Sequence, residues 1–501
     1  MMSYQIVQAG MGIAVSDWLL ANTVGQLGQL GVVSGTALDT VLIRRLQLGD
    51  PTEHIRKALA EFPYPAMAER ILKKYFIPSG KAAQTAFARS PMLSLKMTTE
   101  QLELLTVANF VEVYLAKLGH MQKIGINFLE KIQTPILPSL YGAMLAGVDV
   151  VLMGAGIPKE VPFVLDRLAQ GEDADYRFHV AGATEGDDFR LQFSPSSFVG
   201  KTAPKLKRPD FLAIISSNTL GTMLAKKIAH PVDGFVVEAP TAGGHNAPPR
   251  GKMTLNPRGE PIYGERDRVN FAELAKLGLP FWLAGSSGSP EGLHAALKAG
   301  ANGIQVGTAF ALCRESGLDP ALRHKLLAQG LQGRADVYTD PVASPTGFPF
   351  KVANLKGSNS EPETYQQRNR VCDLGYLREA YKKVDGLVGY RCASEPVAQF
   401  MAKGGDAADS EGRKCLCNAL MANIKMGQLQ KDGEVEKPIL TIGDDVNQVQ
   451  RFVKPGQQDF SAADVIEIIL KDQPAPTRQS EIKPGLFQCE TNLLNKQNNR
   501  A

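Results

Sequence analysis

The chain has 501 residues, of which 44% are apolar and 21% are charged, and its net charge at pH 7 is +4. This composition predicts a globular protein longer than one ordinary domain, and so weak a net charge excludes nucleic acid and anionic membrane surfaces as expected partners. No apolar run is long enough to cross a bilayer, the first residues lack a signal-peptide pattern, and six cysteines are too few for a disulfide framework, so we expect a cytoplasmic protein with no membrane contact.

Short apolar strands alternate with helices through the first 350 residues. The strands are expected at 4–8, 32–35, 124–128, 148–153, 211–215, 234–238, 280–284 and 303–306. The helices are expected at 18–30, 41–48, 51–62, 66–75, 99–118, 139–146, 162–169, 219–228 and from Pro290 to Gly300. Eight strands, each followed by a polar or glycine-bearing loop, predict an α/β fold of the (β/α)8 TIM barrel type over residues 1–350. An open doubly wound sheet is the alternative, but no Gly-x-Gly-x-x-Gly follows the first strand.

Three segments depart from this rhythm. Residues from about 39 to 119 predict a helical insertion, and residues from about 173 to 209 predict a small β insertion or a lid over the barrel mouth. Residues 351–501 predict a mainly helical C-terminal extension, which includes a capped amphipathic helix at Ser461–Leu470.

The stretch Glu238–Arg250 directly follows an apolar strand. Gly243 and Gly244 let the backbone approach a ligand closely, and His245 is then held at the carboxyl edge of the sheet, where ligands of parallel α/β proteins bind. A Gly-Pro turn with a solvated histidine is the alternative. Arg250 is either a cation for an anionic substrate or a solvated loop charge.

Two neighbouring strand ends carry small residues and hydroxyl groups. Ala284–Ser286 and Val306–Thr308 lie just before a helix that begins at Ser289-Pro290, and this arrangement predicts a phosphate site. At the end of another strand, Asn127 either reads the donors and acceptors of a heterocycle or belongs to a turn.

Four cysteines lie in the C-terminal third: Cys372, Cys392, Cys415 and Cys417. Their spacing fits no standard zinc or iron–sulfur pattern, so a metal site and buried unligated thiols both stay open. Arg413 and Lys414 immediately precede Cys415, and we expect these cations to lower the pKa of its thiol.

Several of these motifs together resemble the nitronate monooxygenase (2-nitropropane dioxygenase) family of FMN barrels. They are Gln8–Met11, Gly125–Asn127, Ala242–His245, Ala284–Ser286 and Gly303–Thr308, in this order along the first 350 residues. Within that superfamily, the segment Leu140–Pro158 is closer to the trans-acting enoyl reductases of polyunsaturated fatty acid and polyketide synthases.

The resemblance implies an FMN cofactor and a single catalytic residue, His245, facing the reactive side of the flavin. The residues that would hold FMN are Ala9, Gly10 and Met11 against the ring system, Asn127 and Gln305 as polar contacts, Gly243 and Gly244 close to the ring, and Gly285, Ser286, Gly307 and Thr308 at the phosphate. His245 would act as acid/base on a nitronate, or would position the carbonyl or deliver a proton in an enoyl reduction. No resident metal is implied.

The resemblance leaves the reaction open. Oxidation of alkyl nitronates with O2 is the first expectation, although many nitronate monooxygenases carry a second histidine where this chain reads Met153–Gly156. The alternatives are an enoyl reductase that uses NAD(P)H on acyl-carrier-bound chains, and a flavin-binding partner protein without turnover. The substrate is accordingly a small molecule or an acyl-carrier-bound chain, and a homodimer and a synthase complex both stay open.

Overall fold

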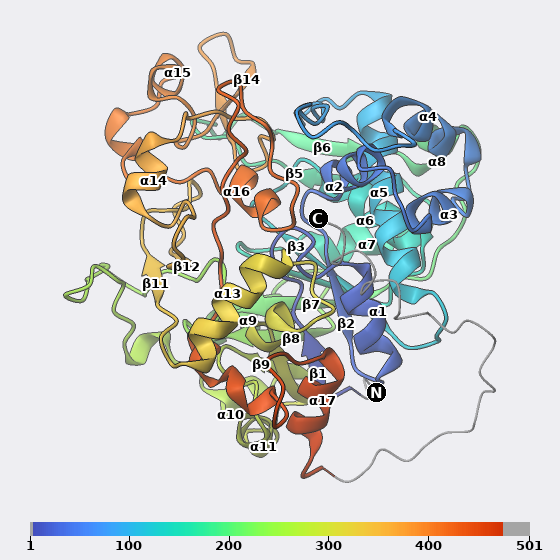
Figure 1. The fold of residues 1–501 in the computed structure, drawn as a ribbon. Coiled ribbons are helices and arrows are strands. Elements are labelled where there is room, and N and C mark those ends of the chain that lie inside the picture. Colours follow the sequence, from blue (N-terminus) through green and yellow to red (C-terminus); the bar gives the residue numbers. More distant parts are fainter. Residues whose placement is uncertain (1–3, 474–501) are drawn as a thin grey trace.

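The computed structural model describes residues 4–473, and a barrel of eight parallel strands forms its centre (Figure 1). The strands are β1 (Ile6–Gln8), β2 (Gly31–Ser34), β3 (Ile124–Leu129), β4 (Val150–Gly154), β7 (Asp210–Ile215), β8 (Gly234–Glu238), β9 (Phe281–Ala284) and β10 (Gly303–Val306). They are hydrogen-bonded in the order β1-β10-β9-β8-β7-β4-β3-β2. All eight predicted strands are confirmed, with only small shifts at their ends.

The side chain of Gln8 closes the seam between the first and last strands of this order. The backbones of β1 and β2 touch only through a bridge between Val7 and Leu30. Beyond it, Oε1 of Gln8 accepts from the Val32 N–H at 3.0 Å, and Nε2 donates to the Val32 carbonyl at 3.1 Å. The amide of a fully buried glutamine thus continues the ladder, and the sheet is a nearly closed barrel rather than an open doubly wound sheet.

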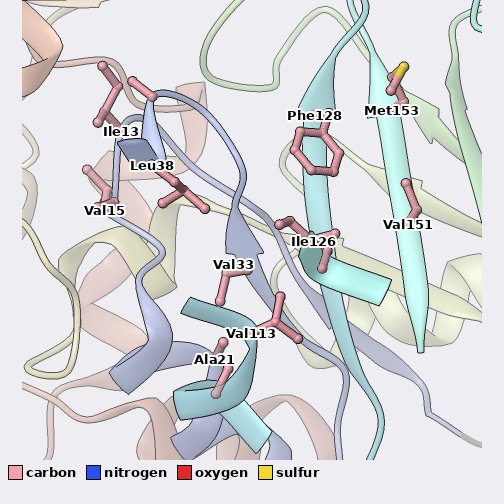
Figure 2. Packing of buried hydrophobic residues seen from close by; sticks show 14 of the residues in the cluster. Ile13, Val15, Ala21, Val33, Leu38, Val113, Ile126, Phe128, Val151 and Met153 are labelled. Atoms are coloured by element: carbon pink, nitrogen blue, oxygen red, sulfur yellow. The ribbon is translucent and has the colours of Figure 1, made fainter. Parts of the chain in front are cut away.

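Alternate strand residues form two separate apolar layers, as the period of two requires. Those that point inward, among them Val32, Leu152 and Trp282, form one cluster inside the barrel. Those that point outward pack on the helices: Figure 2 shows Val33 and Ile126, paired in register on β2 and β3, beside side chains of the surrounding helices. The barrel interior is therefore a packed core, and the space for a ligand lies at its end.

Helices surround the barrel; nine of those given next lie at the expected places, and the sequence did not predict α10, α12 and α13. They are α1 (Trp18–Gln26), α2 (Leu38–Gln47), α3 (His54–Ala60), α4 (Pro65–Tyr75), α5 (Thr99–Lys117), α6 (Ile136–Leu145), α7 (Val161–Ala169), α9 (Asn218–Lys226), α10 (Phe271–Ala275), α11 (Pro290–Lys298), α12 (Thr308–Leu312) and α13 (Pro320–Leu331). The caps follow from sequence: Asp17 accepts from Leu19 and Leu20 N–H groups, and Ser289 accepts from that of Gly292. Helices α2 to α5 fill the predicted helical insertion. Within residues 4–473, none of the helices combines the length and apolar character needed to cross a bilayer.

The segment predicted as a β insertion contains the antiparallel strands β5 (Ala174–Arg177) and β6 (Arg190–Phe193), followed by the short helix α8 (Pro195–Val199). A bridge between Ala181 and Tyr381 links it to a second hairpin, β13 (Glu379–Lys382) and β14 (Val388–Arg391). No residue of β5, β6 or α8 lines the cavity described below, so this segment is not a lid over that site.

Beyond the barrel, the chain wraps back along one side of it (orange and red in Figure 1). After the paired strands β11 (Val337–Asp340) and β12 (Phe350–Ala353), long irregular segments join short helices: α14 (Pro362–Gln367), α15 (Val397–Ala402), α16 (Leu416–Ala422), the 3-10 helices η2 (Ala407–Ser410) and η3 (Asp444–Phe452), and α17 (Ala462–Leu470). Ser461 and Asp464 form the expected capping box of α17, which packs on α1, α11 and α12. The division into a barrel and an extension at residue 350 stays a prediction.

Candidate functional site

A cavity opens at the carboxyl ends of the barrel strands, and every residue predicted for the site lines it. These residues are Ala9, Gly10, Met11, Asn127, Gly243, Gly244, His245, Gly285, Ser286, Gln305, Gly307 and Thr308. They come from five different strand ends, so the fold brings together residues that are almost 300 positions apart at the extremes. Their roles toward a cofactor stay predictions.

The loop after β1 forms one wall of the cavity. The hydroxyl of Ser16 donates to the Ala9 carbonyl at 2.7 Å and accepts from the Met11 N–H at 2.9 Å, which fixes the loop. A Cβ on Gly10 would lie 2.4 Å from Cβ of Asn127, so only glycine fits there. Nδ2 of Asn127 donates to the Gly10 carbonyl at 3.3 Å, whereas its buried Oδ1 has no hydrogen-bond partner among residues 4–473. An acceptor is therefore left for a ligand.

His245 lies on the opposite wall, held by the segment around β12. Its loop is fixed by two backbone bonds, from Asn246 N–H to the Pro349 carbonyl and from Lys351 N–H to the Gly244 carbonyl, each at 2.9 Å. Its Nε2 lies 2.7 Å from Oγ of Ser344, and its ring centre lies 4.8 Å from that of Phe350. Burial lowers the pKa of the His245 imidazole to about 4, so the ring is neutral near pH 7. The alternative of a solvated histidine is wrong.

Glu238, the last residue of β8, is a cavity residue to which the sequence assigned no role. Its side chain has no ion-pair or hydrogen-bond partner within residues 4–473, and burial raises the pKa of its carboxyl to about 8. This carboxyl is consequently protonated at neutral pH. The available signal was a glutamate at the end of an otherwise apolar strand.

The ends of β9 and β10 form the corner predicted to bind phosphate. Gly285 has φ +96°, and a Cβ there would lie 2.8 Å from Oγ1 of Thr241. Ser286 follows with φ +53°. The backbone N–H groups of Ser286, Gly307 and Thr308 donate to no acceptor within the described part of the chain. Free amides at two adjacent strand ends are typical of an anion site.

The C-terminal extension completes the cavity, which the sequence did not indicate. Thr441 accepts from the Gly244 N–H at 2.7 Å, and a Cβ on Gly243 would lie 2.8 Å from the carbonyl carbon of Ile442. The hydroxyl of Thr308 donates to the carboxylate of Asp445. The extension is thus a wall of the site and reaches the corner predicted to bind phosphate.

No lysine or arginine within residues 4–473 lines this cavity; its ionisable groups are Glu238, His245 and Asp445. Arg250 is exposed and donates to the Ser216 carbonyl at 3.3 Å outside the cavity. Of the two alternatives for Arg250, the solvated loop charge is therefore the one that the structure shows. The described lining of the cavity offers no cation to an anionic substrate.

The four cysteines of the extension border one small separate pocket. Among residues 4–473, no group of three or more His, Cys, Asp or Glu side chains has an arrangement that could hold a metal ion. The expected lowering of the pKa of the Cys415 thiol is wrong: burial raises it to about 12. The neighbouring cations are directed elsewhere, Arg413 to the Ser344 carbonyl at 2.6 Å and Lys414 to the Asn359 carbonyl at 2.9 Å.

Comparison with known proteins gives a family match and distant relatives. Residues 196–337 match the family model described as nitronate monooxygenase. One relative is (3aS,4S,5R,7aS)-5-hydroxy-7a-methyl-1-oxo-octahydro-1H-indene-4-carboxyl-CoA dehydrogenase from Rhodococcus jostii. The chain is 30% identical to it over 148 residues, and this match covers 29% of this chain and 36% of the relative. The chain is 28% identical over 207 residues to nitronate monooxygenase from Paraburkholderia phytofirmans, covering 40% of this chain and 52% of that protein.

The chain thus matches about a third to a half of the length of these curated relatives. Among solved structures, FabK from Thermotoga maritima aligns over 94% of this chain and 92% of its own, with 14% identity and a TM-score of 0.44. The family match runs from before β7 to β11 and includes His245 and the corner between β9 and β10. The part of the chain that matches the nitronate monooxygenase family model therefore lies within the barrel.

Proposed function

We propose that the protein is an FMN-dependent oxidoreductase with its active site at the mouth of the barrel. The family match supports this proposal, because it covers the half of the barrel that contains His245 and the predicted phosphate corner. The geometry supports it independently, since a heterocycle and a phosphate need different surroundings and the cavity offers both.

The residues present fit FMN. The unpartnered Oδ1 of Asn127 suits an N–H of the ring system, and Gly10 lets the loop after β1 pack directly against Asn127 at this wall. At the other end, the free N–H groups of Ser286, Gly307 and Thr308 suit the phosphate. When bound there, FMN would supply two-electron exchange with a substrate.

We infer that the substrate is uncharged at its reacting end and that the reaction is reduction of an activated carbon–carbon double bond next to a thioester carbonyl. The observation that carries this inference is the charge of the cavity: its described lining holds two carboxyl groups and one neutral histidine, but no lysine or arginine. An anionic nitronate would lose its hydration there without gaining a counter-charge. One relative is named a carboxyl-CoA dehydrogenase, which supports a thioester substrate.

Two of the titratable residues of the cavity, Glu238 and His245, have distinct parts in this reaction. Glu238 holds a proton on its carboxyl at neutral pH and is the proposed donor of this proton to the substrate carbon as that atom gains electrons. His245 is neutral, and because Nε2 faces Ser344, Nδ1 is the ring atom left to orient the substrate carbonyl. NADH or NADPH is the proposed electron donor, and an acyl carrier or a synthase complex is the proposed source of the chain.

Oxidation of alkyl nitronates with O2 is the second candidate. The family match and the relative named nitronate monooxygenase favour it. The cavity disfavours it, since besides lacking a cation it has no histidine among Met153–Gly156.

Anaerobic reduction of the FMN-loaded protein separates these candidates. Bleaching of the flavin absorbance by NADH or NADPH, and its return on addition of an enoyl thioester, is the expected result. Bleaching by a nitronate alone would identify the monooxygenase reaction instead. A flavin that responds to none of these would identify a flavin-binding partner without turnover, and failure to bind FMN at all would overturn the proposal.

A further inference from the structure

Asp445 lies at the corner of the cavity where the phosphate of FMN is proposed to bind. The hydroxyl of Thr308 donates to Oδ1 of Asp445, and a Cβ on Gly288 would lie 3.8 Å from its Oδ2. The Gly443 N–H donates to Oγ1 of the same Thr308 at 3.3 Å, so the backbone two residues before Asp445 is tied to this hydroxyl as well. A carboxyl group therefore lies between the two strand ends that offer free amides, so an acidic side chain shares a site built for an anion.

The charges around Asp445 do not neutralise it. Burial is the main reason that the pKa of its carboxyl is raised; Asp444 acts in the same direction, and Arg451 acts against it. Asp444 is itself paired with Lys351 at 2.8 Å. The other ionisable groups on the elements packed around η3 or lining the cavity are Arg323, His324 and Lys325 of α13, Asp464 and Glu467 of α17, and Glu238 and His245 of the cavity.

None of these groups supplies a close counter-charge. Arg323 and His324 are directed to Asp459 at 2.6 and 3.6 Å, and Lys325 is exposed. The loops 284–289 and 305–308 and the helix α12 contain no ionisable side chain. A phosphate entering this corner would thus face a carboxylate in surroundings of low polarity, where repulsion between like charges is large.

We propose that FMN binds with uptake of one proton by Asp445, so that this residue makes the affinity for FMN depend on pH. The inference rests on the proposed function, because it assumes that the phosphate occupies the corner between β9 and β10. Protonated Asp445 can still accept from Thr308, and its carboxyl O–H becomes a donor to a phosphate oxygen instead of a repelling charge.

The proposal predicts a specific pattern of affinities. One proton taken up on binding weakens the affinity by up to about tenfold for each pH unit above the pKa of free Asp445. Riboflavin has the same ring system and side chain without the phosphate, so its affinity should not show this dependence. The phosphate of FMN itself titrates near pH 6 and adds its own pH dependence to the affinity. This dependence is the same for a variant that lacks the Asp445 carboxylate, so comparison with that variant removes it.

The test is a titration of the flavin-free full-length chain with FMN and with riboflavin, followed by flavin fluorescence, at about pH 6 and about pH 8. Asp445→Asn keeps an acceptor for Thr308 and removes the charge. Glu411→Gln is the control, because Glu411 is exposed on the same extension and does not line the cavity. A melting curve of each protein confirms that the variants are folded.

The expected result is that Asp445→Asn binds FMN at least about tenfold more tightly than wild type at the higher pH, with a smaller difference at the lower pH and no change for riboflavin. Equal FMN affinities of wild type and Asp445→Asn at both pH values would overturn the proposal. Weaker binding of both flavins to Asp445→Asn would also overturn it, because Asp445 would then be a structural support or a partner of the ribityl chain. If no folded protein binds either flavin, the proposed function itself fails.

Discussion

The imidazole Nε2 of His245 lies 2.7 Å from the hydroxyl oxygen of Ser344, a residue 99 positions further along the chain. Ser344 is fully buried, and its hydroxyl lies 2.8 Å from that of Thr346 while its carbonyl accepts from Arg413. The orientation of the histidine in the barrel is therefore set by a segment beyond the eighth strand, which is in turn held by the C-terminal extension. The extension is thus part of the candidate site rather than an appendage.

Replacing Ser344 by alanine should lower turnover without removing FMN. Loss of this hydrogen bond leaves the ring of His245 free to rotate, and one hydrogen bond of about 1 kcal/mol corresponds to a decrease in kcat of about fivefold. His245→Ala should cost more, on the order of a hundredfold, because it removes the group itself. Steady-state kinetics and bound-flavin absorbance measure both effects.

Ser358→Ala is the matched control for Ser344→Ala, because Ser358 is equally buried but bonds to the Leu355 carbonyl outside the cavity. It should leave kcat unchanged. Unchanged kcat in Ser344→Ala, with FMN bound in full, would show that the contact with His245 has no part in the reaction.

Substitutions at Gly307 should act on FMN binding in proportion to their size. A Cβ at Gly307 would meet only ordinary contacts, at 3.6 Å from the Met11 sulfur and 3.8 Å from Ala9, so Gly307→Ala should fold and still bind FMN. Gly307→Leu would fill the phosphate corner and should abolish stoichiometric FMN binding while leaving the melting temperature of the flavin-free protein within a few degrees. Retention of FMN by Gly307→Leu would contradict the phosphate assignment.

The barrel was predictable from sequence because its signals are local. An apolar run such as Phe211–Ile215, a cap such as Ser217 and a glycine at a strand end each specify structure within a few residues, and repetition of the pattern eight times fixes the fold. The same locality explains why the loop residues from Ala9 to Thr308 could be assigned to one site: parallel strands of a barrel all end on one face.

Apart from Glu238, the residues that the sequence missed depend on long-range placement. Nothing local connects Asp445 with Thr308, since the intervening extension has no repeating pattern that gives its path. Burial decided the other errors. Burial outweighs the cations next to Cys415 in the sequence and raises the pKa of its thiol. The neighbouring Arg413 had suggested a lowered pKa. Exposure likewise decided between the two interpretations of Arg250.

Three thiols of the extension should react slowly. Burial raises the pKa values of Cys372 and Cys392 to about 11 and that of Cys415 to about 12, so less than about one thiol in a hundred is ionised at pH 8. Alkylation followed by mass spectrometry should label these three cysteines only after addition of urea. Rapid labelling of native Cys415 would mean that the segment around α16 opens easily.

Glu238→Gln should stabilise the protein at alkaline pH. The carboxyl has a pKa of about 8 when folded and an ordinary value of 4.5, so the folded state binds the extra proton and wild-type stability falls as the pH rises from about 4.5 to about 8. Glutamine removes this loss, and we expect a gain of about 2 kcal/mol in the free energy of unfolding at about pH 8.5. Urea unfolding should show a smaller gain at about pH 5.5. A gain that does not grow with pH would place the carboxylate in a solvated environment.

The rate of enoyl reduction should have a plateau bounded by the pKa values of His245 and Glu238. Below about pH 4 the imidazole becomes charged, and above about pH 8 the carboxyl loses the proton that it is proposed to deliver, so kcat should fall on both sides. Glu238→Gln should reduce kcat by about a hundredfold or more and remove the alkaline limb, since the variant has no proton to lose. Glu411→Gln is a change of the same type at an exposed position, and it should keep both the wild-type kcat and the alkaline limb. An alkaline limb that persists in Glu238→Gln would assign it to another group and leave Glu238 without a part in proton transfer.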